Sequence, residues 1–393
     1  MQFCRIALLC AVVFSAAIVR AHDEPDEERA IEKIELLRGK IERDENLPGA
    51  PVVSIRFRGT QRVNDQYLHL LKSFPYLTTL NLHRTKITDV GLADIGELRT
   101  LTTLDLSFTQ VADAELPRLQ GLTSLTELNL AGTRITDAGI QHLQPLQNLT
   151  RLNVCGTPIT DAGLRDVATL QNLTTLEIGE CRIGDMGVRE LKTLKKLSTV
   201  FAPQTLITDA GIRELANCES LTHLTLDHTR ITDAGISSLR GLNLTTLSVA
   251  VTKTTDEGLR QIAEIKDLQQ LFLSGTLITD EGLKELQGFT GVHTLTLGRT
   301  KVTDAGLKHL RHLKTLKCLS LTHLPISDKG LKDVAALTEL ENLDLNWTQI
   351  TDGGLLELQS LTKLKALDVN GTKVTDAGIS AFRHAHPHVR IVR

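Results

Sequence analysis

Aromatic residues are scarce in this sequence: Phe, Trp and Tyr make up 3% of its 393 residues, and there is a single Trp. Aliphatic side chains must therefore supply almost the whole core, which is unusual for a mixed globular enzyme. An excess of one charge is lacking too, because 44 Lys and Arg stand against 47 Asp and Glu. A basic surface for nucleic acid is therefore not expected.

Long apolar runs are also missing, apart from one near the start. Residues 6–19 are apolar and follow Arg5, but they are too few for a spanning helix of roughly 20 residues. The run is followed by a small residue at Ala21 and then by an acidic segment. We therefore expect residues 1–21 to be a signal peptide. The mature chain would begin at His22, contain no transmembrane span, and be secreted, periplasmic or at the cell surface.

One sequence pattern recurs along most of the chain, and an Asp occupies the same position in each copy. Twelve of the thirteen intervals between these Asp residues are 24 residues long, and the interval from Asp233 to Asp256 is 23. Repeats of 20 to 29 residues with regularly spaced Leu are typical of leucine-rich repeat solenoids. The marks are Asp65, Asp89, Asp113, Asp137, Asp161, Asp185, Asp209, Asp233, Asp256, Asp280, Asp304, Asp328, Asp352 and Asp376.

Each repeat contains two different periodicities. Leu128 and Leu130 alternate with polar residues, as a half-buried strand requires. Asp137 then begins a short helical turn, for which we predict the role of N-cap. Gly139 and its equivalents allow close approach between stacked coils. A mark that recurs in every repeat is not expected to be catalytic.

A Thr column accompanies the Asp marks, running from Thr85 through Thr133 to Thr372, with Cys181 and Leu324 as exceptions. Its hydroxyls can satisfy backbone groups of the turn that leaves each strand. The pattern L-x-x-L-x-L-x-x-T-x-I-T-D-x-G-L resembles that of secreted bacterial leucine-rich repeat proteins, and of the cysteine-containing leucine-rich repeat class. The resemblance implies an α/β fold, a right-handed horseshoe-shaped solenoid with a parallel concave sheet and short convex helices.

The two ends of the solenoid are predicted separately. Residues 22–50 should form an N-terminal helical cap, with a helix over 24–38, and short strands are expected at 40–43 and 51–58. The solenoid proper should cover 51–393 in about 14 units and end in a strand near 388–392.

Two irregularities lie in the middle of the repeats. Pro203 follows an atypical strand, and the repeat that contains Leu242 is one residue short. They are either drift in a tolerant repeat or a local change that shapes a ligand patch. Exposed aromatic residues among small polar ones are typical of interface anchors. The candidate ligand-binding residues are Phe201, His223, Thr225, Asp227, Ser248 and Phe272.

Catalysis, metals and cofactors are not expected. His223, Thr225 and Asp227 share one face, but their rows lie roughly 7 Å apart and cannot form a hydrogen-bonded relay. His384, His386 and His388 would line up on an extended chain and could then hold Zn or Cu, but spare histidines in a tail are the commoner explanation.

The cysteines of the repeats are predicted to form no disulfide. Cys155 and Cys318 should be accessible, whereas Cys181 and Cys218 should be buried.

The leading functional hypothesis is therefore an exported, non-enzymatic scaffold that offers its concave sheet to a protein, or to a glycan. A self-assembling envelope component is the alternative, and the oligomeric state stays open. The resemblance to the cysteine-containing class also implies a role as a substrate-recognition adaptor of a ubiquitin ligase. We find no partner-binding motif for that role before the repeats.

Overall fold

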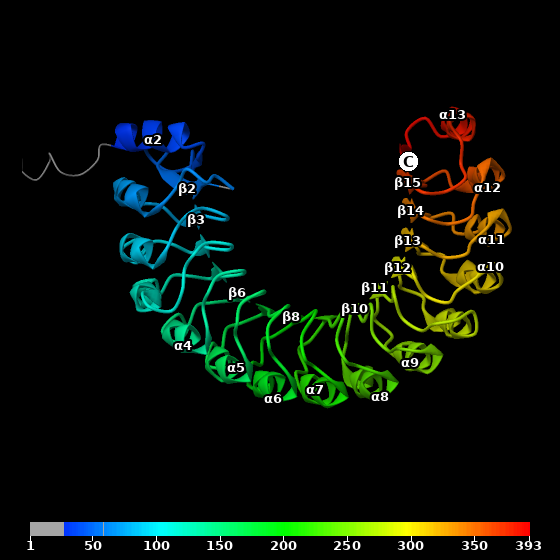
Figure 1. Ribbon diagram of the computed structural model, residues 1–393, viewed down its shortest axis with the longest axis horizontal. Coiled ribbons are helices and arrows are strands. Elements are labelled where there is room, and N and C mark those ends of the chain that lie inside the picture. The colour runs from blue at the N-terminus through cyan, green and yellow to red at the C-terminus, as the bar shows by residue number, and fades with distance from the viewer. Residues whose placement is uncertain (1–26, 58) are drawn as a thin grey trace, which may run out of the picture. The chain divides into compact units, whose positions relative to one another are not determined.

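The computed structural model describes residues 27–57 and 59–393, and the predicted signal peptide lies outside these residues. The chain divides into two compact units, one ending at Ile159 and one running from Thr160 to Arg393. Figure 1 gives the element labels used below.

The first unit begins with a helix and a hairpin and continues with parallel strands. Strand β1 pairs antiparallel with β2, and each strand from β2 to β6 then pairs parallel with the next. The strands are β1 Lys40–Arg43, β2 Val52–Arg56, β3 Thr79–Asn81, β4 Thr103–Asp105, β5 Glu127–Asn129 and β6 Arg151–Asn153. The α-helices are α2 Glu27–Leu36, α3 Leu92–Ile95 and α4 Asp137–Ile140, and the 3-10 helices are η1 Asp65–Ser73, η2 Asp89–Gly91, η3 Leu116–Gly121 and η4 Gln141–Leu143.

The second unit repeats one strand and one helical segment ten times. Its strands are β7 Thr175–Glu177, β8 Thr199–Phe201, β9 His223–Thr225, β10 Thr246–Ser248, β11 Gln270–Phe272, β12 Thr294–Thr296, β13 Cys318–Ser320, β14 Asn342–Asp344, β15 Ala366–Asp368 and β16 Arg390–Val392. They pair in parallel, each with the next.

Helices of this unit lie on the opposite side of the repeats from the strands (Figure 1). The α-helices are α5 Asp161–Val167, α6 Asp185–Val188, α7 Asp209–Leu215, α8 Asp233–Ile236, α9 Asp256–Ile262, α10 Asp304–Leu307, α11 Asp328–Val334, α12 Asp352–Glu357 and α13 Asp376–Ala385. The 3-10 helices are η5 Arg189–Thr193, η6 Ser237–Gly241, η7 Gly282–Gly288, η8 Lys308–His312 and η9 Leu358–Ser360. This arrangement confirms the predicted leucine-rich repeat solenoid.

The core is an aliphatic stack, as the composition predicts. The middle residue of each strand points inward, and Leu224, Leu247 and Leu271 are at most 1% exposed. From β3 onward the strands are only three residues long, so each repeat buries the middle strand residue, and the two flanking residues lie on the sheet face.

The repeated Asp links consecutive repeats, which corrects its predicted role as an N-cap. The cap of α8 is Thr232, whose hydroxyl accepts a hydrogen bond from the Ala234 N–H. Asp209 Oδ1 accepts the Thr232 N–H at 2.7 Å, and Asp209 Oδ2 accepts the Thr232 hydroxyl at 2.7 Å. A side chain on Gly235 would place its Cβ 2.6 Å from Asp209 Oδ1, so glycine is required there. The prediction of close approach at this glycine column is confirmed.

The Thr column works as predicted. The Thr229 hydroxyl is buried and donates to the Leu226 carbonyl at 2.6 Å, and Thr85, Thr133 and Thr276 make the same bond in their own repeats. A buried carbonyl at the end of each strand is thereby satisfied.

The N-terminal segment forms a helix, α2, which ends at Leu36, and the antiparallel strands β1 and β2. Helix α2 buries Ala30 and Ile34. The chain reverses after this helix at Arg38, which has a φ of 63°, whereas the following Gly39 does not have a positive φ. Gly39 is needed for space instead, because a Cβ there would lie 2.5 Å from Ile34.

The two sequence irregularities do not interrupt the sheet. Strand β8 pairs in register with β7 and β9, and β10 pairs in register with β9 and β11. Pro203 lies just after β8, where its carbonyl accepts the Glu180 N–H at 2.9 Å. Because Pro203 lies outside β8, its lack of a backbone N–H removes no hydrogen bond of that strand.

Among the described residues, none of the helices combines the length and the apolar character needed to cross a membrane.

Candidate functional site

The predicted patch lies on the strand face of the second unit. The register places Phe201 beside Thr225, Thr225 beside Ser248, and Ser248 beside Phe272. These four residues therefore form one continuous row across β8 to β11, as the sequence predicts. His223 stands at the opposite end of β9, and Asp227 follows that strand.

Exposure differs strongly between the members of this row. Phe201 is 39% exposed and Phe272 is half-buried, so both rings present apolar surface. Ser248 is 5% exposed, and its hydroxyl donates to Asp227 Oδ1. The same Asp227 oxygen accepts the Ala250 N–H at 2.9 Å. Asp227 and Ser248 thus also hold the turn that leaves β10.

The His223 imidazole is exposed, and its Nδ1 lies 2.8 Å from the Thr222 hydroxyl. Within the part of the chain that the structure describes, no hydrogen bond joins His223 to Asp227 or to Thr225. A nucleophile activated by a positioned base needs that contact. His223, Thr225 and Asp227 therefore do not form a hydrogen-bonded relay in this structure.

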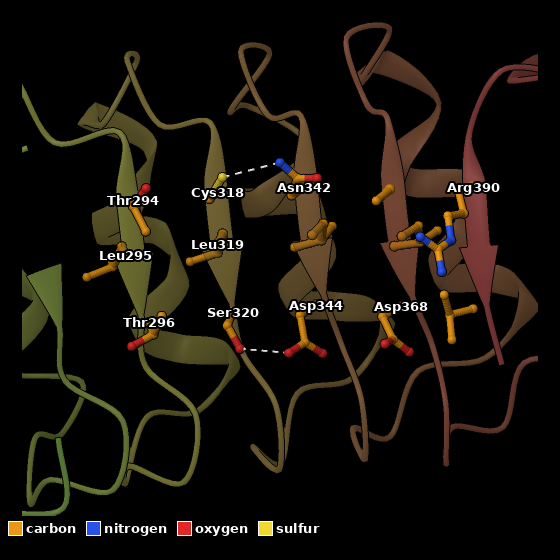
Figure 2. A pocket seen from close by; sticks show the side chains of 14 residues that line it. Thr294, Leu295, Thr296, Cys318, Leu319, Ser320, Asn342, Asp344, Asp368 and Arg390 are labelled. Carbon is orange, nitrogen blue, oxygen red and sulfur yellow. Dashed lines mark hydrogen bonds between the residues drawn. The ribbon is translucent and has the colours of Figure 1, made fainter. Parts of the chain in front are cut away.

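A hollow of about 360 Å³ lies further along the same face, over β12 to β16. Figure 2 shows Ser320, Asp344 and Asp368 in a row along one side of it, with Cys318 and Asn342 on the other. Arg390 from β16 stands at one end.

The carboxylates of this hollow are held by backbone and hydroxyl donors. Asp344 accepts the Ser320 hydroxyl and the Asn346 N–H, both at 3.0 Å. Asp368 Oδ1 accepts the Asn370 N–H at 3.2 Å. The sequence indicated that these side chains point outward, but not that the sheet face is hollowed here, because that depends on how neighbouring side chains lean.

The C-terminal histidines do not line up as an extended chain would place them. His384 belongs to α13, and His386 follows it as a 3%-exposed residue stacked on Phe382 at 4.3 Å. Only His386 and His388 have their rings near each other, with centroids 6.5 Å apart. Helix α13 runs through Ala385, so the chain is not extended there and the three histidines do not form a one-sided row. In the described residues no group of three His, Cys, Asp or Glu side chains is placed to hold a metal ion.

The burial of the cysteines agrees with the prediction. All four in the repeats are thiols, with Cys181 and Cys218 3% exposed and Cys155 and Cys318 partly exposed. Burial raises the pKa of the Cys218 thiol to about 11, with Lys195 acting weakly in the opposite direction.

Comparison with known proteins assigns the family. The profile described as a leucine-rich repeat region matches residues 52–303, and a second leucine-rich repeat profile matches 337–358 and 360–382. The chain belongs to the leucine-rich repeat family, whose members are generally scaffolds for protein interactions.

Similar solved structures show the same fold. An internalin from Listeria monocytogenes is 22% identical, with a TM-score of 0.56, and the match covers 94% of this chain and 95% of that one. A leucine-rich repeat protein from Leptospira interrogans is 20% identical, with a TM-score of 0.53, over 86% of this chain and 88% of that one. A search of curated proteins found no match.

Proposed function

We propose that the chain is an exported, non-enzymatic scaffold that binds a protein ligand on the strand face of its second unit. The observation that carries this proposal is the row on that face from Phe201 across β9 and β10 to Phe272, whose two aromatic rings are accessible, together with the hollow over β12 to β16. Export is proposed from the apolar run and the small residue that precede His22. A secreted, periplasmic or cell-surface location follows from it.

The row and the hollow have complementary chemistry for a protein. Phe201 and Phe272 offer apolar anchors of the kind that dominate interface energies. Asp344 and Asp368 offer acceptors to basic or amide side chains. A glycan would use the same polar groups, and is the second class of ligand that the face fits.

Photo-crosslinking from the strand face tests this proposal. A photoreactive residue in place of Thr296 would face the ligand, whereas one in place of Lys332 on α11 would face away from the strands. We expect a specific crosslinked protein only from position 296, in an extract of the exporting cell's envelope. Equal crosslinking from both positions would contradict a strand-face site.

Affinity measurements with the captured ligand then test the predicted patch. Phe201→Ala and Phe272→Ala should each weaken binding by about 1 to 3 kcal/mol. The matched control is Asn129→Ala, on β5 of the first unit. An equal loss from the control would show that the aromatic patch has no special role.

A further inference from the structure

A second surface lies outside the strand face, where the chain turns after each strand. One residue of every such turn has a positive φ, and two of the turns in the second unit use Gly275 and Gly371. Other repeats place large side chains there, including Arg299, His323 and Trp347, with φ values of 57°, 56° and 58°. This backbone region favours glycine, so these side chains are present at a conformational cost.

Trp347 is the most prominent of them. It is the single Trp of the chain and is 58% exposed. Its ring packs over Gly371 of the next repeat, since a Cβ on that glycine would lie 2.7 Å from the indole. The His323 ring stacks against it at 5.6 Å with an interplanar angle of 6°. The large exposed ring is therefore held in one orientation by its neighbours.

A recess of about 390 Å³ extends from Trp347 along the same edge. Gly275 and Gly298 are among the residues that line it, and Val251, 46% exposed, provides an apolar contact. None of its nine lining residues is acidic.

Hydrogen-bond donors are in excess in this recess. Arg299 Nη2 donates to His323 Nε2 at 3.3 Å, so the imidazole is an acceptor at that nitrogen. Among the described residues Arg299 has no carboxylate partner, and its other N–H groups remain available. Asn346 uses its side-chain oxygen to accept the Asn370 N–H at 2.9 Å, which leaves its amide N–H groups as donors. The Trp347 indole N–H is a further donor.

The first unit shows how the chain arranges a similar aromatic without this excess. Phe108 is 52% exposed and packs over Gly132, but the Arg84 guanidinium lies over its ring at 5.2 Å from the centroid. That cation is paired with an aromatic face within the chain. Arg299 has an imidazole acceptor instead, which leaves its positive charge uncompensated.

We infer that Arg299, Asn346 and Trp347 form a contact site for a carboxylate-bearing segment of the protein ligand. A carboxylate accepts two N–H bonds from a guanidinium in a bidentate geometry, and a neighbouring apolar side chain of the ligand would lie against Val251. Trp and Arg are also the residue types enriched at binding hot spots. This inference rests on the proposed protein ligand and adds the chemistry that the ligand presents at this edge.

The single Trp makes the site directly observable, because indole fluorescence and the indole N–H resonance report on position 347 alone. The probe is an acetylated, amidated Gly-Glu-Leu-Gly peptide, compared with the same peptide carrying Gln in place of Glu. We expect a saturable change with the acidic peptide and at least about tenfold weaker binding of its Gln analogue. No change up to about 10 mM peptide, or an equal change with both peptides, would overturn the inference.

Two variants test whether the Arg299 guanidinium is responsible for binding of the acidic peptide. Arg299→Gln should weaken binding of the acidic peptide at least about tenfold. Arg230→Gln, an exposed Arg that follows β9, three repeats away from Arg299, should leave it unchanged. An unaltered response in Arg299→Gln with an unaltered melting curve would also overturn the inference.

Two further results separate this inference from the broader proposal. If glucuronate bound more tightly than the peptide, the site would be assigned to an acidic glycan, and the inference of a protein carboxylate would be overturned. A peptide response that fails while ligand capture still depends on Phe201 would remove the edge site and leave the strand-face proposal intact.

Discussion

The recurring Asp shows how one residue can be essential to the fold without capping its own helix. Its carboxylate reaches across to the Thr that caps the next helix, 23 residues later in the chain, as Asp209 does to Thr232. A pattern confined to one repeat cannot reveal this, because helix capping by Asp is the common local arrangement. The neighbouring Gly is a second clue, since it makes room for that carboxylate.

Removing this link should destabilise the chain. Asp209→Ala leaves the Thr232 N–H and hydroxyl without their acceptor, and we expect a loss of about 2 kcal/mol in the free energy of unfolding, measured in urea. The control is Asp376→Ala, where the carboxylate is 95% exposed and contacts Arg393. An exposed pair contributes little, so the control should be nearly neutral. Equal effects would contradict the linking role.

The cysteines give a second prediction at the scale of single residues. In a chain that begins at His22, Cys155 and Cys318 should react rapidly with a thiol reagent at pH 8. Cys181 and Cys218 should not, because both are buried and the pKa of Cys218 is raised to about 11, so its thiolate is scarce. Denaturation should expose all four. Fewer than four thiols in the denatured monomer would contradict the assignment of faces.

The strand and its turn tolerate substitutions that the sequence marks as irregular. Thr254 replaces the buried Ile of other repeats and is 0% exposed. Its hydroxyl lies 2.8 Å from the Thr252 hydroxyl, which itself donates to the Val249 carbonyl at 2.6 Å. The polar substitution is thus accommodated by the neighbouring Thr column, and the strand keeps its register.

A matched pair of variants tests this account. Thr254→Val removes a buried hydroxyl and should stabilise the chain by about 0.5 to 1 kcal/mol. Thr252→Val removes the donor to Val249 and should destabilise it by about 1 kcal/mol. Thermal and urea unfolding of both variants provide the comparison. A stabilising Thr252→Val would show that the column hydroxyls do not support the turn.

The stability of the fold should depend on pH through an Asp at the start of a helix. The pKa of Asp352, the first residue of α12, is lowered by the Thr375 N–H, by the Thr375 hydroxyl and by Arg393. A folded-state pKa below the unfolded value of about 3.9 stabilises the fold above that pH, and the stabilisation is lost as the pH falls through the folded pKa. Asp352→Asn should therefore flatten the decrease in melting temperature below about pH 4. An equal decrease in melting temperature at acidic pH in Asp352→Asn and in the unaltered chain would contradict this contribution.

At the scale of the whole molecule, the architecture was predictable from the repeat. The candidate recognition surface was predictable only in part. A 24-residue register identifies strands, turns and buried columns because every copy supplies the same information. The row from Phe201 to Phe272 followed from that register alone. The recess beside Trp347 did not, because it depends on which turns use glycine and on how Arg299 and His323 lean toward each other.

The balance between binding and self-assembly is also a property of the whole molecule. Exposed large apolar side chains in the described residues are dispersed over different rows of the repeats, such as Tyr76, Met186, Phe201 and Trp347. Contiguous apolar patches are what drive stable association, and the nearly balanced charge of 44 basic and 47 acidic residues provides no strongly charged surface to substitute for them. We therefore expect multi-angle light scattering of the chain from His22 onward to give the monomer mass at every concentration. A mass that rises with concentration would favour the envelope assembly, and a rise abolished by Arg390→Glu would locate the contact at β16.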